Sequence, residues 1–300
     1  MLSRRWMADF KRRFNGLKQS INELIIVDDA FGLRETKLAL NQEDWSAATR
    51  SEQINRFKRW LGGQVAVKVL RAYGEEQWWR SYIIQAHVKG LGRAYDDVNR
   101  YAKTGNAAFY EGGKKRFLTD AFTKPVSVER VKVLVQRADT GFTGITGAME
   151  SQITRVLVDG LIAGTGPREL AKALNDRVDK IGISRANTLA RTEIIRAHAD
   201  GQLDALEALG VTEVGVMVEW TATKDSRTCP QCASLQNVVL SIEKARGLIP
   251  RHGNCRCAWI PAGVGEKDKN QIKGTNRIRA AIRRSLKAGE DKEWVGENLL

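Results

Sequence analysis

Five side chains that can bind a metal ion lie close together in this sequence. All four cysteines of the 300-residue chain fall within 29 residues, as a C-x-x-C pair, Cys229 and Cys232, followed by an H-x-x-C-x-C group, His252, Cys255 and Cys257. Thiolate and imidazole donors at such spacings are typical of a structural zinc site, which takes four ligands. The sequence therefore indicates zinc binding with one donor to spare, either Cys257 or His252.

Two arrangements without a metal would also account for the cysteine cluster. The thiols could be small buried groups that pack at hairpin bends. They could also form two disulfides, although a reducing cytoplasm disfavours these unless the protein later leaves it. C-x-x-C is a redox motif as well, but no thioredoxin-like βαβ pattern surrounds it.

Several catalytic motifs are missing from the sequence. The chain has only three histidines, His87, His198 and His252, and none forms an H-E-x-x-H helix. An HNH-like nuclease needs a second histidine near His252, which makes this a weak alternative. Neither a P-loop nor a G-x-S-x-G motif occurs. These absences argue against a zinc hydrolase, a P-loop ATPase and a G-x-S-x-G hydrolase.

Composition indicates a folded, basic protein. Lys and Arg number 49 against 35 Asp and Glu, a net charge of +14, and 42% of residues are hydrophobic. This length predicts about two domains, and the charge favours polyanionic partners such as nucleic acid. We expect no signal peptide and no stable membrane insertion, because no apolar run approaches the roughly 18 residues that a span needs.

The elements expected to position the cysteines belong to an α+β fold that is mostly helical. Trp6, Phe10 and Phe14 recur every four residues along a first helix, a stripe that suits core packing, a partner groove or a membrane surface. Three glycines in residues 139–147 predict a loop and a domain boundary. Further helices are predicted over residues 41–61, 75–101, 148–163, 167–178 and 185–209, the last capped by Ser184, with strands over 214–220 and 258–260.

We thus expect three parts: a helical N-terminal region, residues 1–145; a small α+β domain with the Cys/His loop or hairpin, residues 146–262; and a basic amphipathic C-terminal helix or tail, residues 263–300. In the tail, Ile278, Ile282 and Leu286 share one face. Eight basic residues predict non-specific contact with DNA phosphates: Lys267, Lys269, Lys273, Arg277, Arg279, Arg283, Arg284 and Lys287.

Several motifs in a fixed order surround the cysteines. The order is R-T-E at Arg191–Glu193, a strand ending at Trp220, D-S-R-T-C-x-x-C from Asp225, and H-x-N-C-R-C from His252. Over residues 148–261 this pattern closely resembles the Mu F-like phage head morphogenesis family, the minor head proteins of tailed double-stranded DNA phages. One departure is Asn237, where relatives typically have Gly; Asn tolerates a left-handed backbone best among the remaining residue types.

The resemblance implies a structural virion component, not an enzyme, in the phage head interior or at the portal vertex, assembled in the host cytoplasm. Its expected partners are the portal protein, major capsid or scaffold proteins and packaged DNA, with no small-molecule substrate. The main alternative is a zinc-containing DNA-binding regulator. Such a protein places basic residues around its zinc, whereas residues 201–250 carry a net charge of −2.

The motif residues have expected structural roles. Arg191 and Glu193 are predicted to pair with the turn from Asp225 to Arg227, holding helix to loop. Asn254 is predicted to turn the chain so that Cys255 faces Cys229. An ADP-ribosyltransferase would use Glu193 catalytically, but the E-x-E pair of that class is missing because Ile194 and Ile195 follow it.

Overall fold

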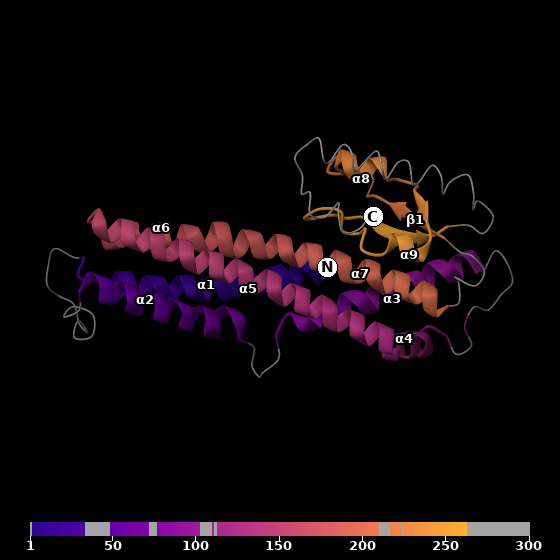
Figure 1. The fold of residues 1–300 in the computed structure, drawn as a ribbon, viewed down its shortest axis with the longest axis horizontal. Helices are drawn as coiled ribbons and strands as arrows, with labels where there is room; N and C mark the ends of the chain where they lie inside the picture. The colour runs from indigo at the N-terminus through magenta and orange to yellow at the C-terminus, as the bar shows by residue number, and fades with distance from the viewer. Residues whose placement is uncertain are drawn as a thin grey trace. The chain divides into compact units, whose positions relative to one another are not determined.

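The computed structural model describes residues 2–33, 49–71, 77–102, 110, 113–209, 217–223 and 225–262. These residues form a mostly helical α+β structure with one small antiparallel sheet, which confirms the predicted fold class (Figure 1). The chain divides into two compact units, Met1–Ser81 with Gln136–Ala190, and Tyr82–Val135 with Arg191–Leu300. The basic residues from Lys267 to Lys287 lie outside the described part, and the three-part division expected from sequence stays a prediction.

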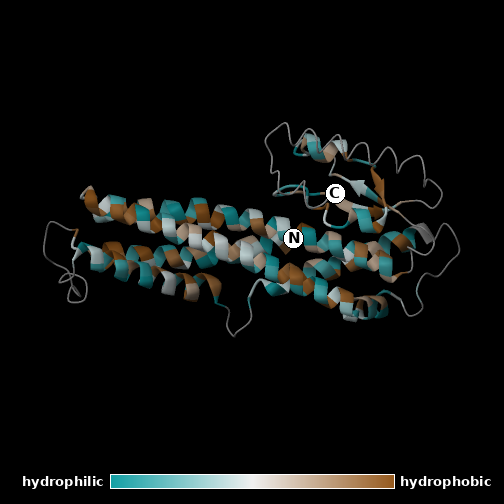
Figure 2. Ribbon diagram, viewed as in Figure 1, coloured by the Kyte–Doolittle hydropathy of each residue, from teal (hydrophilic) through white to brown (hydrophobic). Residues whose placement is uncertain are grey.

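The described residues of the first unit form helices joined by short turns and contain no strand. Apolar and polar residues are interspersed along the helices, as expected when one face of each helix packs in the core and the other faces solvent (Figure 2). The helix α2 begins at a capping box in which Thr49 and Glu52 satisfy each other's backbone N–H groups. Its elements are α1 (Leu2–Asn22), η1 (Glu23–Val27), α2 (Arg50–Gln64), η2 (Val65–Leu70), α6 (Pro167–Arg177), η3 (Val178–Ile183), and parts of α5 (Pro125–Ile162) and α7 (Ser184–Ala208).

The aromatic stripe of α1 belongs to the core of this unit. Trp6, Phe10 and Phe14 are at most 1% exposed. The ring of Phe10 meets that of Phe142 edge to face, with centroids 4.7 Å apart, and that of Trp78 at 5.0 Å. The stripe is therefore occupied by packing within the chain, so the partner-groove and membrane-surface interpretations are wrong.

The glycine-containing segment 139–147 is helical, so the predicted loop is wrong. It lies in the middle of α5, where Phe142, Thr146 and Met149 are buried at helical spacing. Gly141 serves close packing, because a Cβ atom there would lie 2.9 Å from the Leu189 side chain. Burial of Phe142 outweighs the roughly 1 kcal/mol helix penalty of each glycine.

A second correction concerns Ser184, the predicted cap of a new helix. The structure confirms a helix start at Pro167 with Glu169 in its first turn. However, η3 continues α6 directly into α7, and Ser184 itself has helical dihedral angles, φ −65° and ψ −47°. A cap residue has a non-helical backbone, so Ser184 lies inside a continuous helical stretch.

The second unit carries the cysteines and the sheet. Its elements are most of α3 (Arg80–Ala102), α4 (Gly113–Thr123), parts of α5 and α7, β1 (Val218–Thr221), α8 (Pro230–Ser234), β2 (Val239–Leu240), α9 (Ile242–Ala245) and β3 (Ala258–Pro261). The strand order is β2-β1-β3, with Trp220 opposite Trp259. These two indoles are 1% exposed and meet edge to face. The strand predicted over 258–260 is confirmed, and so is the end of the one predicted over 214–220, of which residues 214–216 lie outside the described part.

A buried ionic cluster and a close helix crossing join α3 and α7 within this unit. Asp204 on α7 is bound by His87 Nε2 at 2.9 Å, Arg130 Nε at 2.9 Å and Arg246 Nη1 at 3.0 Å. Nearby, a Cβ atom on Gly201 would lie 2.2 Å from the carbonyl oxygen of His87. Only glycine permits this backbone approach. Among the described residues, no helix has the length and apolar character needed to cross a membrane.

Candidate metal centre

The first two cysteines are held by the start of a short helix. Cys229 is the residue before α8, and Pro230 occupies the first helical position. The backbone N–H of Cys232 donates to Cys229 Sγ at 3.3 Å. This hydrogen bond keeps the two sulfurs of the C-x-x-C pair on one tight turn, as the spacing predicted.

The remaining three donors follow a turn that the motif residues support. Asn254 has a left-handed backbone, φ 62°, so it turns the chain as predicted. Its backbone N–H donates to Thr192 Oγ1 at 3.3 Å, and Arg191 Nη1 donates to Asn254 Oδ1 at 3.5 Å. The R-T-E helix therefore holds the loop that carries Cys255. Asn237 also has a left-handed backbone, φ 64°, a conformation that Asn tolerates better than other residue types apart from Gly.

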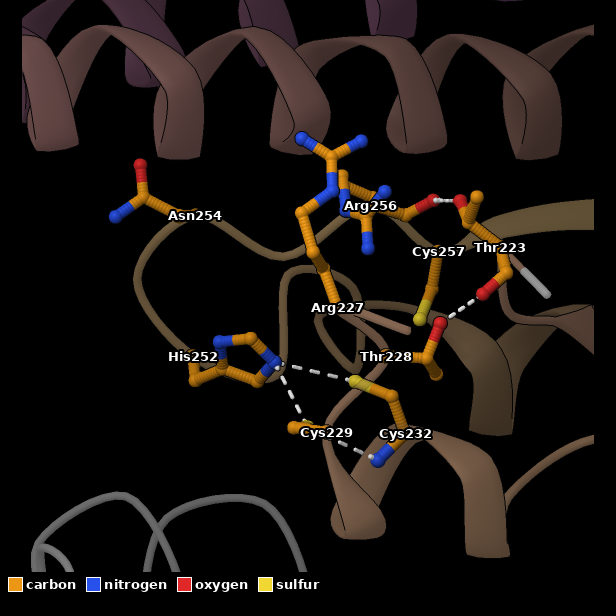
Figure 3. Close-up of a pocket in the computed structure, with 9 residues that line it drawn as sticks. All are labelled: Thr223, Arg227, Thr228, Cys229, Cys232, His252, Asn254, Arg256 and Cys257. Carbon is orange, nitrogen blue, oxygen red and sulfur yellow. Dashed lines mark hydrogen bonds between the residues drawn. The ribbon is translucent and has the colours of Figure 1, made fainter. Parts of the chain in front are cut away.

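Several pairs of donor atoms are about as far apart as neighbouring ligands of one zinc ion. His252 Nε2 is 3.2 Å from the sulfurs of both Cys229 and Cys232 (Figure 3). Cys232 Sγ is 3.9 Å from Cys255 Sγ. Zn–S bonds of about 2.3 Å and Zn–N bonds of about 2.0 Å place neighbouring ligand atoms roughly 3.5–3.8 Å apart. The separations of 3.2 and 3.9 Å lie within a few tenths of an ångström of these values.

His252 is also oriented as a metal ligand usually is. Its Nδ1 contacts the carbonyl oxygen of Gly253 at 2.8 Å, which makes Nδ1 the protonated nitrogen and leaves Nε2 free to bind a metal. This arrangement favours His252 as a ligand over the role of spare donor.

Cys232 connects two overlapping sets of donors. The donor atoms of Cys229, Cys232 and His252 lie within 4.8 Å of one another, and so do those of Cys232, Cys255 and Cys257. The sulfur that Cys255 contacts is that of Cys232, whereas Cys229 was the predicted neighbour. These Cys/His groups could hold a metal ion.

Crowding of the buried thiols changes their acidity. Hydrogen bonds from Cys232 and Cys257 lower the pKa of Cys255, and the hydrogen bond to Cys255 raises the pKa of Cys232. Adjacent sulfurs cannot all ionise together at low cost, because like charges repel in a buried site. A divalent cation between them would remove that repulsion.

An ion pair connects the two cysteine-bearing segments. Arg256 donates from Nη1 to Asp225 Oδ2 at 2.5 Å and from Nη2 to Oδ1 at 2.6 Å. This contact holds the pKa of Asp225 well below its usual range. Asp225 is therefore bound by Arg256, not by the predicted Arg191; Glu193 is buried, with Arg196 Nε 3.6 Å away. Sequence reasoning missed Arg256 as the partner of Asp225, although its place between two cysteines was the available signal.

A small pocket lies against the cysteines, and arginines contribute to its wall (Figure 3). The net charge of −2 over residues 201–250 did not predict this, because that range leaves out Arg256 and averages over residues far from the cysteines. In the folded chain, Arg227 and Arg256 line this pocket. Arg191 contacts Asn254, another lining residue. The lining residues are Thr223, Arg227, Thr228, Cys229, Cys232, His252, Asn254, Arg256 and Cys257.

Comparison with known proteins agrees with the motif pattern. Residues 151–260 match the family described as Phage Mu protein F like protein. This range contains the R-T-E helix, the sheet and all five donor residues. No curated protein matches the chain, and no solved structure does. The match therefore supports the resemblance that the motifs predicted: residues 151–260 are similar to the Phage Mu protein F like family.

Proposed function

We propose that this chain is a minor head protein of a tailed double-stranded DNA phage and assists head assembly at or near the portal vertex. The match of residues 151–260 to the Phage Mu protein F like family carries this proposal. The contacts of Arg191 and Thr192 with Asn254 support it, because motifs far apart in sequence form one packed unit. Its partners are the portal and the major capsid or scaffold proteins, and it has no substrate to turn over.

The test is head assembly with and without this chain. Portal, scaffold and capsid proteins of the same phage are co-expressed, and particles are purified and examined by negative-stain microscopy and mass spectrometry. We expect the chain to be present in few copies per particle, and its omission to reduce the yield of normal heads. Particles that are unchanged and never contain the chain would refute the proposal.

The cysteine cluster, in this proposal, holds one structural zinc ion. Cys229, Cys232 and His252 supply three ligands, and a sulfur of the second pair, from Cys255 or Cys257, supplies the fourth. The Sγ–Nε2 separations of 3.2 Å support this set. Zinc, when bound, supplies a fourfold cross-link between loops, so its binding free energy is also folding free energy. The assembly role and the zinc site stand on separate observations.

Metal analysis tests the zinc site. Protein purified without chelators should contain about one equivalent of zinc, and Cys229→Ser or Cys232→Ser should abolish it. Of the variants Cys255→Ser and Cys257→Ser, one should keep most of the zinc. The other should lose it, and the cysteine replaced in that variant is the fourth ligand. Ser234→Ala, on the same short helix, is the matched control. Metal-free protein with four freely titrating thiols would refute the zinc site in favour of buried packing.

The segment from Lys267 to Lys287 is proposed to contact packaged DNA non-specifically. If about five charges meet phosphates, log affinity should fall with log salt at a slope of roughly −4 to −5. Replacing Arg279, Arg283, Arg284 and Lys287 by Ala should reduce that slope, and an unchanged slope would refute the proposal. The arginines beside the cysteines favour a DNA-binding regulator as second candidate; sequence-specific binding in the same assay would support it.

A further inference from the structure

The proposed zinc site is built from two segments that are distant in sequence. Cys229 and Cys232 belong to the first, residues 225–235, and His252, Cys255 and Cys257 to the second, residues 250–257. Nineteen residues separate Cys232 from His252. A metal binds more tightly when its ligands are already held close to the required geometry, because less of the binding free energy is then spent on ordering them. Contacts that join the two segments without using a donor atom are therefore of interest.

Arg256 makes such contacts with both its side chain and its backbone. The guanidinium binds both oxygens of Asp225, and Thr223 Oγ1 donates to the carbonyl oxygen of Arg256 at 3.0 Å. Asp225 is fixed in turn, because Oδ1 accepts the backbone N–H of Arg227 at 3.0 Å. A two-pronged arginine–carboxylate pair sets direction as well as distance. Arg256 thus joins the second segment to the first at one defined position.

The position of Arg256 between two cysteines gives this pair a consequence for the sulfurs. Burial alternates along the segment: Cys255, Cys257 and Trp259 are buried, while Arg256 and Ala258 are partly exposed. In such a segment, neighbouring side chains point to opposite sides. Fixing Arg256 toward Asp225 therefore directs both cysteine sulfurs to the other side, where Cys232 lies 3.9 Å from Cys255.

We propose that Asp225 and Arg256 are positioning residues for the metal: their ion pair sets the register of the two ligand segments before zinc binds. This inference rests on the zinc site proposed above. Neither residue touches the metal. The pair acts by reducing the number of arrangements that the five donor atoms can adopt, so its loss weakens metal binding while the ligands themselves remain.

Metal affinity tests the pair in the full-length protein. The variants are Asp225→Asn, Arg256→Ala and their double mutant, with Arg256→Lys keeping the charge but losing the two-pronged geometry. Arg227→Ala is the matched control, because Arg227 also contacts Asp225, at 3.3 Å, but from the same segment and with its side chain 77% exposed. Zinc affinity is measured by competition with a chromophoric chelator, and ligand geometry by the visible spectrum of the cobalt(II)-substituted protein.

We expect both single substitutions to weaken zinc binding about tenfold, the lower end of the range for residues that orient metal ligands. The double mutant should be no weaker than either single one, because the two side chains act as one unit. The zinc affinity of Arg256→Lys should lie between those of Arg256→Ala and the wild type. The affinity of Arg227→Ala should equal that of the wild type. The cobalt spectrum should broaden in the weakened variants, a change that a general loss of stability does not produce.

The outcomes separate the two proposals. A wild-type protein that binds neither zinc nor cobalt overturns the zinc site and this inference with it. A wild type that binds zinc tightly, alongside variants of equal affinity and unchanged cobalt spectrum, overturns the positioning role alone. Additive losses in the double mutant also overturn it. Should Arg256→Ala fail to fold, Arg256→Lys and Asp225→Asn decide the question, because both side chains are about one-third exposed.

Discussion

Asp200 should make the protein less stable at neutral pH than at mildly acidic pH. This carboxyl group on α7 lies beside Asp204 and near Arg130, Arg196 and Arg246, and burial raises its pKa to about 6. An unfolded Asp titrates at about 3.9. Because the folded pKa is the higher one, the folded state loses stability as pH rises from about 4 through 6. The charged form is the one that burial disfavours.

The size of the effect follows from the shift of about two pKa units. At 1.36 kcal/mol per unit, ionised Asp200 lowers the free energy of unfolding by about 3 kcal/mol at pH 8, and by roughly half of that at pH 5. Asp200→Asn keeps the shape and removes the charge. We therefore expect this variant to be more stable than the wild type, by an amount that increases by about 1.5 kcal/mol between pH 5 and pH 8.

Urea denaturation of both proteins at several pH values measures this difference. The amide and the neutral carboxyl group can differ in stability by a constant amount. This amount cancels, because the test uses only how the difference in unfolding free energy between the two proteins changes with pH. Titration of the remaining groups, including the proposed zinc ligands, is common to both proteins and also cancels. A stability difference that does not vary between pH 5 and pH 8 would refute the reasoning, as would a variant whose disadvantage grows with pH.

Three further predictions concern packing, each measured by urea denaturation. Gly201→Ala should destabilise the protein by about 2–3 kcal/mol, because the new Cβ atom meets the His87 carbonyl oxygen. Gly144→Ala, which has open space around it, should stabilise the protein by about 0.5–1 kcal/mol. Equal effects of the two substitutions would contradict the close helix crossing. Phe142→Ala should destabilise by about 3–5 kcal/mol, and a loss below about 1 kcal/mol would show that the ring is dispensable. Deletion of residues 1–16 should abolish cooperative unfolding of the first unit; a truncated protein that unfolds normally would contradict the core role of α1.

The cysteine cluster illustrates how far sequence alone could go. Residue type and spacing determined which five side chains can bind a metal, because donor chemistry and the short C-x-x-C and C-x-C spacings are local properties. The order of motifs identified the family over nearly the range that matches it. Which donor lies beside which was not a local property. The 3.9 Å contact between Cys232 and Cys255 depends on how β1 and β3 pair.

The aromatic spacing likewise predicted α1, and the helix-start signals at Pro167 and Ser184 predicted helices over α6 and most of α7. The glycine rule failed at residues 139–147, where local glycine preference and burial of Phe142 oppose each other and the tertiary core decides. The aromatic stripe of α1 could equally have served a partner, and only the packed structure shows that Phe142 covers it. The Asp225–Arg256 pair joins residues 31 positions apart, so no local rule could assign it. Sequence by itself thus determined the chemistry available to this protein, whereas tertiary structure decided the neighbours, because contacts between distant residues depend on the whole chain folding around them.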